Sequence, residues 1–335
     1  MKVKPRKGGR IRRRAITIAI YGAGWLLLTL LLPLWAITGL IIALVRRRHF
    51  IVLRLLFFGW FYFGFELLAL LLIGAVYLRH RPGDARSEAL YRLQAWWASV
   101  NLGMASRLLR LRIEVDGADC ATPGPSIVLV RHASILDTLL PCAYVQRPYR
   151  LRVRYVVKQE LLFDPCIDIV GNALPNYFVD RTGSTSEELA GIRALTQNLG
   201  NDAVLIFPEG TRFSRKKRER TLARLEAEGS AHRAAAGALR VTLPPKPGGV
   251  LTLLDALPDV DCVFLAHSGL ERFAKIGNLL DGAVVGSTVR VKLWRVPRAE
   301  IPMDEGEQLG WLFDRWSEVD SFVGNALETS GVRSG

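Results

Sequence analysis

The sequence is poor in cysteine throughout and in acidic residues near its N-terminus. Its 335 residues include 4 cysteines, and no two of them form a C-x-x-C pair. We therefore expect no disulfide framework and no metal site. Residues 1–65 hold twelve Lys or Arg and no acid, although the whole chain carries a net charge of only +14. Charge concentrated in this way is typical of membrane-flanking segments, so no nucleic-acid partner is predicted.

Histidine is also scarce, and the chain has no Gly-x-Ser-x-Gly sequence. Because that sequence forms the nucleophile elbow of serine hydrolases, its absence argues against a Ser-His-Asp hydrolase. Of the 5 histidines, His49 and His80 lie in the basic flanks of apolar segments. His132 follows an apolar run and is the candidate for chemistry. His267 is a second candidate, although a structural or surface role is the stronger interpretation.

Two apolar runs dominate the N-terminal part of the chain. Residues 15–45 contain no charge, and residues 55–78 contain only Glu66. Each run is long enough to cross about 30 Å of hydrocarbon at about 1.5 Å per residue. Pro33 interrupts the first run, which is therefore either a kinked span or a re-entrant hairpin. In both cases the basic N-terminus and the chain after residue 78 share a side, which the positive-inside rule predicts to be the cytoplasm.

The sequence predicts a basic arm with two membrane segments over 1–82 and a cytosolic domain over 83–335. Pro82 and Gly83 mark the boundary, and apolar residues at helical spacing predict an amphipathic helix over 85–109, lying either along the membrane or on the domain. Short apolar or alternating runs then predict strands at 111–115, 126–130, 151–157, 203–207, 262–265 and 289–296. Helical patterns intervene at 135–145, 186–199, 221–228 and 311–327. The expected fold is α/β, with a central, largely parallel sheet flanked by helices.

Two motifs follow predicted strands. His132 is separated by four residues from Asp137, which can act as a helix-capping acid or orient the imidazole as a base. The segment 207–212 reads Phe-Pro-Glu-Gly-Thr-Arg, in which glycine permits close backbone approach and arginine offers a fork for a phosphate. Chemistry in parallel sheets is expected beyond the carboxyl ends of strands, where both motifs lie.

Together the two motifs resemble the paired signature of the 1-acylglycerol-3-phosphate (lysophosphatidic acid) acyltransferase family, within the lysophospholipid acyltransferase superfamily. The segment 156–161, which contains Lys158, resembles the lysine-containing segment of that family, and the segment 171–181, which ends at Arg181, resembles its arginine block. The segments 243–248 and 311–316 resemble a branch with longer lysophosphatidate and lysocardiolipin acyltransferases. The region near residue 265 departs from the family pattern, since it reads Leu-Ala-His-Ser-Gly.

The resemblance implies transfer of an acyl group from a thioester to the free hydroxyl of a lysophospholipid, with 1-acyl-sn-glycerol 3-phosphate as the first candidate. His132 would be the general base, Asp137 its orienter, and Glu209 would organise the loop or contact the acceptor. The residues implied to bind substrate are Lys158, Arg181, Gly210, Thr211 and Arg212. No cofactor is implied beyond the co-substrate, which is acyl-CoA or an acyl carrier protein thioester.

Other interpretations stay open. The acceptor could be another lysophospholipid or an acylated amino-acid lipid, and a non-catalytic lipid-binding membrane protein is the alternative from another class. In each case the partner is a membrane lipid, and the protein is expected to be integral to the membrane with its globular domain on the cytoplasmic face.

Overall fold

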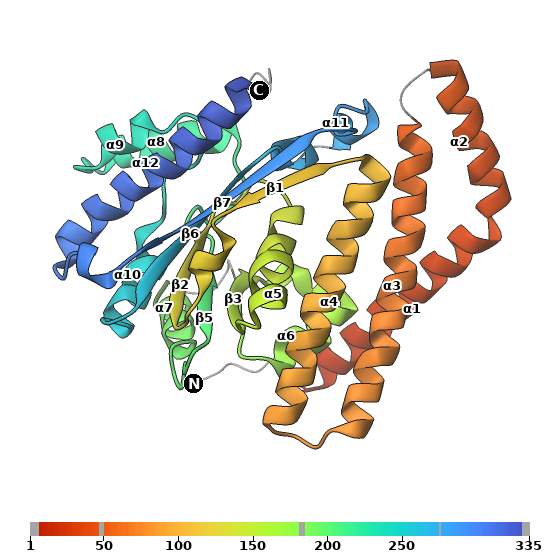
Figure 1. Ribbon diagram of the computed structural model, residues 1–335, viewed down its shortest axis with the longest axis horizontal. Helices are drawn as coiled ribbons and strands as arrows, with labels where there is room; N and C mark the ends of the chain where they lie inside the picture. Colours follow the sequence, from red (N-terminus) through yellow and green to blue (C-terminus); the bar gives the residue numbers. More distant parts are fainter. Residues whose placement is uncertain (1–6, 47–49, 181–184, 275, 330–335) are drawn as a thin grey trace.

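The computed structural model describes residues 7–46, 50–180, 185–274 and 276–329. Its centre is a seven-stranded sheet in the order β1-β7-β6-β2-β5-β3-β4 (Figure 1). The strands are β1 Arg112–Asp116, β2 Ser126–Val130, β3 Val153–Lys158, β4 Tyr177–Val179, β5 Ala203–Ile206, β6 Asp261–Ser268 and β7 Thr288–Val296. Strands β6, β2, β5, β3 and β4 run in one direction, whereas β7 is antiparallel to β6 and parallel to β1. The predicted largely parallel sheet is confirmed.

Two strands differ from the sequence prediction. β4 was not predicted, because three half-buried residues are too few to show an alternating pattern. β6 extends past the predicted 262–265 to Ser268, because its polar residues His267 and Ser268 are buried and continue the pairing with β7. This extension carries His267 to the edge where β2 also ends.

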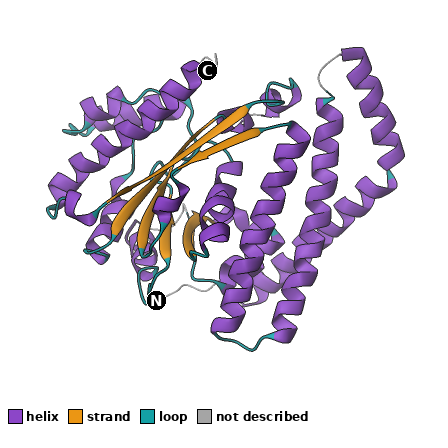
Figure 2. Ribbon diagram, viewed as in Figure 1, coloured by secondary structure: helices purple, strands orange, loops and turns teal. Residues whose placement is uncertain are grey.

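Helices cover both faces of the sheet (Figure 2). Strand β2 shows why: Ile127 and Leu129 pack in one core with α7, α10 and α12, while Val128 and Val130 pack in the other with α4. A strand buried on both faces reads as a continuous apolar run, as residues 126–130 do. The helices of the globular part are α4 Asp84–Leu109, α5 Arg147–Tyr149, α6 Pro165–Ala173, α7 Thr185–Ala194, α8 Arg215–Ala227, α9 Arg233–Ala238, α10 Pro247–Ala256, α11 Ile276–Leu280 and α12 Glu305–Thr329. The predicted amphipathic helix corresponds to α4, which packs on the globular domain through residues such as Ala98 and Leu102.

The N-terminal apolar runs form three helices, α1 Lys7–Leu30, α2 Leu32–Arg46 and α3 Ile51–Arg79. The chain bends by 67° between α1 and α2, next to Pro33. Within the described ranges, α3 is long and apolar enough to cross a membrane by itself. The bent pair of α1 and α2 would supply a second span if the two helices cross together as a single broken span. Both of the paths expected for residues 15–45, kinked span and re-entrant hairpin, are consistent with this bend.

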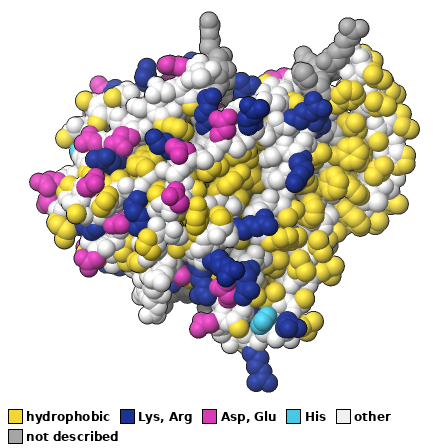
Figure 3. Space-filling view, viewed as in Figure 1, with side chains coloured by type: hydrophobic (Ala, Val, Ile, Leu, Met, Phe, Trp, Pro, Cys, Tyr) yellow, Lys and Arg dark blue, Asp and Glu magenta, His cyan; other side chains and the backbone are white. Residues whose placement is uncertain are grey.

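Large apolar side chains cover the outer surface of these three helices. Figure 3 shows them as a broad region on the side of the molecule formed by α1–α3, with Lys and Arg side chains along its border. The exposed residues include Ile20, Leu26, Leu30, Leu34, Ile37, Leu44, Leu71 and Leu78. A patch of this extent is unstable in water and marks an interaction surface.

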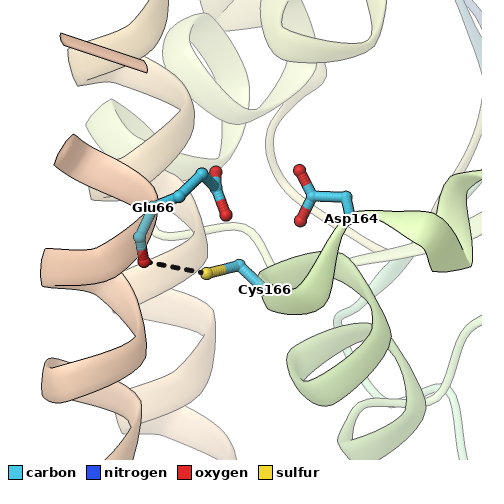
Figure 4. A group of neighbouring side chains, drawn as sticks. All are labelled: Glu66, Asp164 and Cys166. Atoms are coloured by element: carbon cyan, nitrogen blue, oxygen red, sulfur yellow. Dashed lines mark hydrogen bonds between the residues drawn. The ribbon is translucent and has the colours of Figure 1, made fainter. Parts of the chain in front are cut away.

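The side of α3 that faces the globular domain carries a few buried polar groups within an apolar surface (Figure 4). Glu66 is fully buried there and accepts a hydrogen bond from the Trp97 indole at 2.5 Å. Its carboxyl group faces that of Asp164, and these oxygens lie within 4.8 Å of each other and of the Cys166 sulfur. The Cys166 thiol donates to the backbone oxygen of Glu66 at 3.5 Å, and Tyr62 donates to Asp164 at 2.7 Å. These contacts join α3 to the globular domain.

A second polar junction joins α1 to α6. The buried carboxylate of Asp168 accepts a hydrogen bond from Arg13 Nε at 2.9 Å and another from Arg14 Nη2 at 3.1 Å. The two arginine side chains are 22% and 28% exposed, so water screens this pair only in part. The basic N-terminal end of α1 is therefore fixed to the globular domain.

Replacing Asp168→Asn should loosen α1 from the domain, because two arginines lose the charge that holds them. We expect the free energy of unfolding to fall by about 1–3 kcal/mol and trypsin to cut more readily after Arg13 and Arg14, the two arginines that Asp168 holds. Thermal unfolding and limited proteolysis of the detergent-solubilised chain would measure both. The matched control is Asp255→Asn, in the exposed pair with Arg193, which should behave like wild type. Equal behaviour of the two variants would contradict the prediction.

Candidate active site

Four parallel strands end at one edge of the sheet and carry the candidate residues there. His132 lies two residues beyond β2, Lys158 is the last residue of β3, and the segment 207–212 follows β5 directly. His267 stands near the end of β6. Because β2 pairs with both β5 and β6, and β3 pairs with β5, these strand ends lie side by side. They form the edge at which the sequence predicts the site.

The imidazole of His132 faces the carboxylate of Asp137. Its Nδ1 lies 3.2 Å from each carboxylate oxygen. Oxygen Oδ2 also accepts hydrogen bonds from the backbone amides of Ala133 at 2.6 Å and Ser134 at 2.7 Å. The His132 side chain is 10% exposed and that of Asp137 is fully buried. Because Asp137 engages Nδ1, Nε2 is the nitrogen that a substrate hydroxyl can approach.

The charge of Asp137 is stabilised by its neighbours. Burial opposes ionisation, but hydrogen bonds from His132 and His267 outweigh this effect and hold the pKa of the Asp137 carboxyl well below its usual range. The carboxylate is therefore charged at neutral pH. A charged Asp137 favours the tautomer of His132 with hydrogen on Nδ1 and so leaves Nε2 as a proton acceptor.

The segment after His132 differs from the predicted helix over 135–145. It forms a short 3-10 helix, Leu136–Leu139, and then a π-helical turn, Cys142–Gln146. Pro141 lies between them and has no N–H to continue an α-helical ladder. The N-cap residue of the first turn is Ile135, and the Ser134 hydroxyl just before it accepts a hydrogen bond from the Leu136 amide at 3.1 Å. Asp137 therefore acts as a capping acid and also contacts the imidazole.

Glu209 contacts the backbone at the start of this turn and is 1% exposed. One carboxylate oxygen accepts from the backbone amide of His132 at 2.8 Å, and the other accepts from that of Leu243 at 2.9 Å. Burial raises the pKa of Glu209 to about 7, although Arg131 and the two amides favour the carboxylate. Of the two roles expected for Glu209, these contacts match organisation of the loop.

The turn after Glu209 needs glycine. Gly210 has φ +63°, and a Cβ there would lie 3.1 Å from the Lys246 side chain. Lys217 Nζ donates to the Thr211 hydroxyl at 2.8 Å and to the Arg212 carbonyl at 3.0 Å. The Arg212 side chain itself is exposed. The loop thus presents cationic side chains around a turn that permits close approach.

The remaining predicted residues have different outcomes. Lys158 is half-buried at the end of β3, separated from β2 by β5. Arg181 lies outside the described residues. The Phe213 amide donates to the His132 carbonyl at 3.3 Å, which joins the loop after β5 to the turn after β2. The structure therefore brings together His132, Asp137 and the 207–212 segment.

Sequence reasoning missed two cations at this edge. Arg131 is fully buried and donates to the His267 carbonyl at 2.6 Å and to the Glu271 carboxylate. The Lys246 amide donates to the Pro208 carbonyl at 2.8 Å, and the nearby Leu243 amide donates to Glu209. The amine of Lys246 lies close to Gly210. The available signals were an arginine beside His132 and a lysine between two prolines, and neither is specific by itself.

Comparisons with known proteins agree with this geometry. The family model Acyltransferase matches residues 112–262, which include both motifs. A curated relative, lysophosphatidylinositol acyltransferase 10 of Caenorhabditis elegans, is 22% identical over 279 residues, covering 77% of this chain and 69% of that protein.

A solved structure shares the fold. The crystal structure of the 1-acyl-sn-glycerophosphate acyltransferase PlsC from Thermotoga maritima superposes with a TM-score of 0.53. The match covers 84% of this chain and 99% of that chain, at 16% identity. At this identity the likeness concerns the arrangement of sheet and helices.

The Glu209→Gln variant tests the role of the buried carboxylate. Its amide nitrogen cannot accept a backbone N–H, so the variant should be less stable by about 1–3 kcal/mol. The pKa of Glu209 is raised from 4.5 to about 7 in the folded protein. The stabilising contribution of wild-type Glu209 is therefore full below pH 4.5 and declines as the pH rises through about 7.

Thermal unfolding of both proteins across this pH range would measure the difference. Glu219→Gln, at an exposed carboxyl, is the control and should follow wild type at every pH. A difference between Glu209→Gln and wild type that does not change with pH would contradict the assigned titration.

Proposed function

We propose that this chain, whose residues 112–262 match the Acyltransferase family model, transfers an acyl group from a thioester to the hydroxyl of a 1-acyl-sn-glycerol 3-phosphate. The observation that carries the proposal is the contact of His132 Nδ1 with the buried carboxylate of Asp137, 3.2 Å away, at the edge shared with the 207–212 loop. This pair can supply general-base catalysis, and a thioester is already activated toward attack.

The reaction then needs one proton acceptor and correct positioning. His132 Nε2 takes the proton from the acceptor hydroxyl as its oxygen attacks the thioester carbonyl carbon. The new C–O bond forms and the C–S bond breaks. The leaving thiolate then takes the proton from the imidazolium, which yields the free thiol and restores neutral His132. Asp137 stabilises the imidazolium while it exists. No nucleophile from the protein is required.

The phosphate of the acceptor is proposed to bind the cationic loop after β5. Arg212 can form two parallel hydrogen bonds with it, and the backbone at Gly210 allows close approach. Lys246 adds a second positive charge beside that of Arg212, since its amine lies 3.3 Å from the position of a Cβ on Gly210. Thr211, Lys158 and Arg181 remain proposed substrate-binding residues.

A second acceptor is favoured by one comparison. The curated relative is named as a lysophosphatidylinositol acyltransferase, so a lysophospholipid with a larger head group is the alternative. The acyl donor is proposed to be either acyl-CoA or an acyl carrier protein thioester, since both present the acyl group as a thioester. An acceptor assay would also show whether the acceptor is an acylated amino-acid lipid, or whether the protein binds lipid without catalysing transfer.

The apolar helices support a membrane location for this chemistry. We propose that the exposed apolar surface of α1–α3 lies in lipid, where acceptor and product also reside. Arg13 and Arg14 bind Asp168 of the globular domain, so the basic end of α1 lies on the same side as that domain. The positive-inside rule assigns this side to the cytoplasm.

His132→Ala should lower kcat by about 10²–10⁴-fold, because it removes the base. The purified chain would be assayed with one labelled acyl thioester against lysophosphatidate, lysophosphatidylinositol and other lysophospholipids. Circular dichroism would check that the variant is folded. Turnover by His132→Ala equal to that of wild type would reject the base assignment, and no turnover of any acceptor by wild type would reject the transferase.

Lys246→Ala should raise the KM for a phosphate-bearing acceptor by about three- to ten-fold with little change in kcat, because a charge-assisted hydrogen bond is lost. The control is Lys292→Ala, an exposed lysine on β7, which should match wild type. Steady-state kinetics at fixed salt would measure both. An unchanged KM for Lys246→Ala would remove Lys246 from the phosphate site.

A further inference from the structure

Asp137 lies between two imidazoles rather than beside one. On one side is His132 Nδ1, 3.2 Å from each oxygen. On the other is His267 Nε2, 3.6 Å from Oδ2. The side chains of Asp137 and His267 are both fully buried. The second imidazole therefore contacts the group that orients the base and has no access to the substrate.

The backbone of β2 fixes the tautomer of His267. Its Nε2 lies 2.9 Å from the carbonyl oxygen of Arg131, which can only accept a hydrogen bond. Nε2 therefore carries the hydrogen and donates it to this carbonyl, while Asp137 Oδ2 lies 3.6 Å from the same nitrogen, within reach of the positive end of the N–H dipole. Arg131 in turn donates to the His267 carbonyl at 2.6 Å. These reciprocal bonds fix His267 relative to the end of β2.

We propose that His267 is a positioning residue for the transfer reaction, whose Nε2–H holds the Asp137 carboxylate in the orientation that His132 requires. The proposal rests on the proposed function, in which His132 is the base. Because both side chains are fully buried, the N–H dipole 3.6 Å from Oδ2 is little screened by water, so it favours one orientation of the Asp137 carboxylate and limits its basicity.

The surrounding charges are consistent with this role. The ionisable groups that face Asp137 and His267 are His132 and Arg131 from the β2 end, Glu209 from the β5 end and Glu271 after β6. Burial favours the neutral form of Glu271, but Arg131 and His267 outweigh it and lower the pKa of that carboxyl. The depressed pKa of Asp137 also reflects its hydrogen bond with His267.

Two amide variants separate the donor from its position. In His267→Gln the side-chain nitrogen can occupy the place of Nε2, whereas in His267→Asn the shorter amide reaches only the place of Nδ1. A hydrophobic variant, His267→Leu, keeps much of the volume and removes the donor. Each full-length variant would be purified in detergent, and its folding would be checked by near-ultraviolet circular dichroism and thermal unfolding.

We expect His267→Gln to retain kcat within about three-fold of wild type, and His267→Asn and His267→Leu to lose about ten-fold at unchanged KM. In the latter two variants the acid limb of the kcat/KM profile should move to higher pH, because an Asp137 with fewer donors retains the proton shared with His132 more strongly. His267→Gln should keep the wild-type profile.

Two results would overturn the proposal. One is an unchanged kcat and pH profile in folded His267→Leu or His267→Asn. The other is an equal loss in the Gln and Asn variants without a shift of the acid limb, which is the signature of packing alone. If His267→Leu does not fold, the comparison of Gln with Asn decides. Activity of wild type with loss in His132→Ala supports the transferase whatever His267 does, so the two proposals fail separately.

Discussion

The buried carboxylate of Asp137 is the group on which the geometry of the site depends. It accepts hydrogen bonds from the amides of Ala133 and Ser134, and it contacts Nδ1 of His132. The same group therefore shapes the turn after β2 and sets the direction of the imidazole. A buried charge is tolerated only when such donors surround it. The turn, the ring orientation and the ionised state of Asp137 are consequences of one set of contacts.

Around this carboxylate, buried polar groups connect the ends of separate strands. Glu209 joins the β5 end to His132 and to Leu243, and Arg131 joins the β2 end to β6 and to Glu271. Each oxygen of Glu209 is engaged by a backbone amide, so the loops cannot shift without leaving a buried group unsatisfied. The edge that carries His132 is thus preorganised by buried contacts between strand ends.

The globular domain is held to the apolar helices by a few polar contacts within an otherwise apolar interface. Asp168 binds two arginines of α1, and Glu66 and Asp164 meet between α3 and α6. Because polar groups in a buried interface need specific partners, these contacts set how α1 and α3 lie against the domain. They also fix which face of these helices stays exposed and apolar.

The sequence by itself determined the sheet, the apolar segments and the two motifs. Continuous apolar runs such as residues 126–130 and the charge-free run 15–45 follow from local burial, and His132 with Asp137 lies within one turn of chain. Only the tertiary structure decided the contacts of Glu209 with the His132 and Leu243 amides, and the pairing of Arg131 with His267, which are 136 positions apart. Contacts between strands that are distant in the chain depend on sheet order, and sheet order is set by packing of the whole domain rather than by any local pattern.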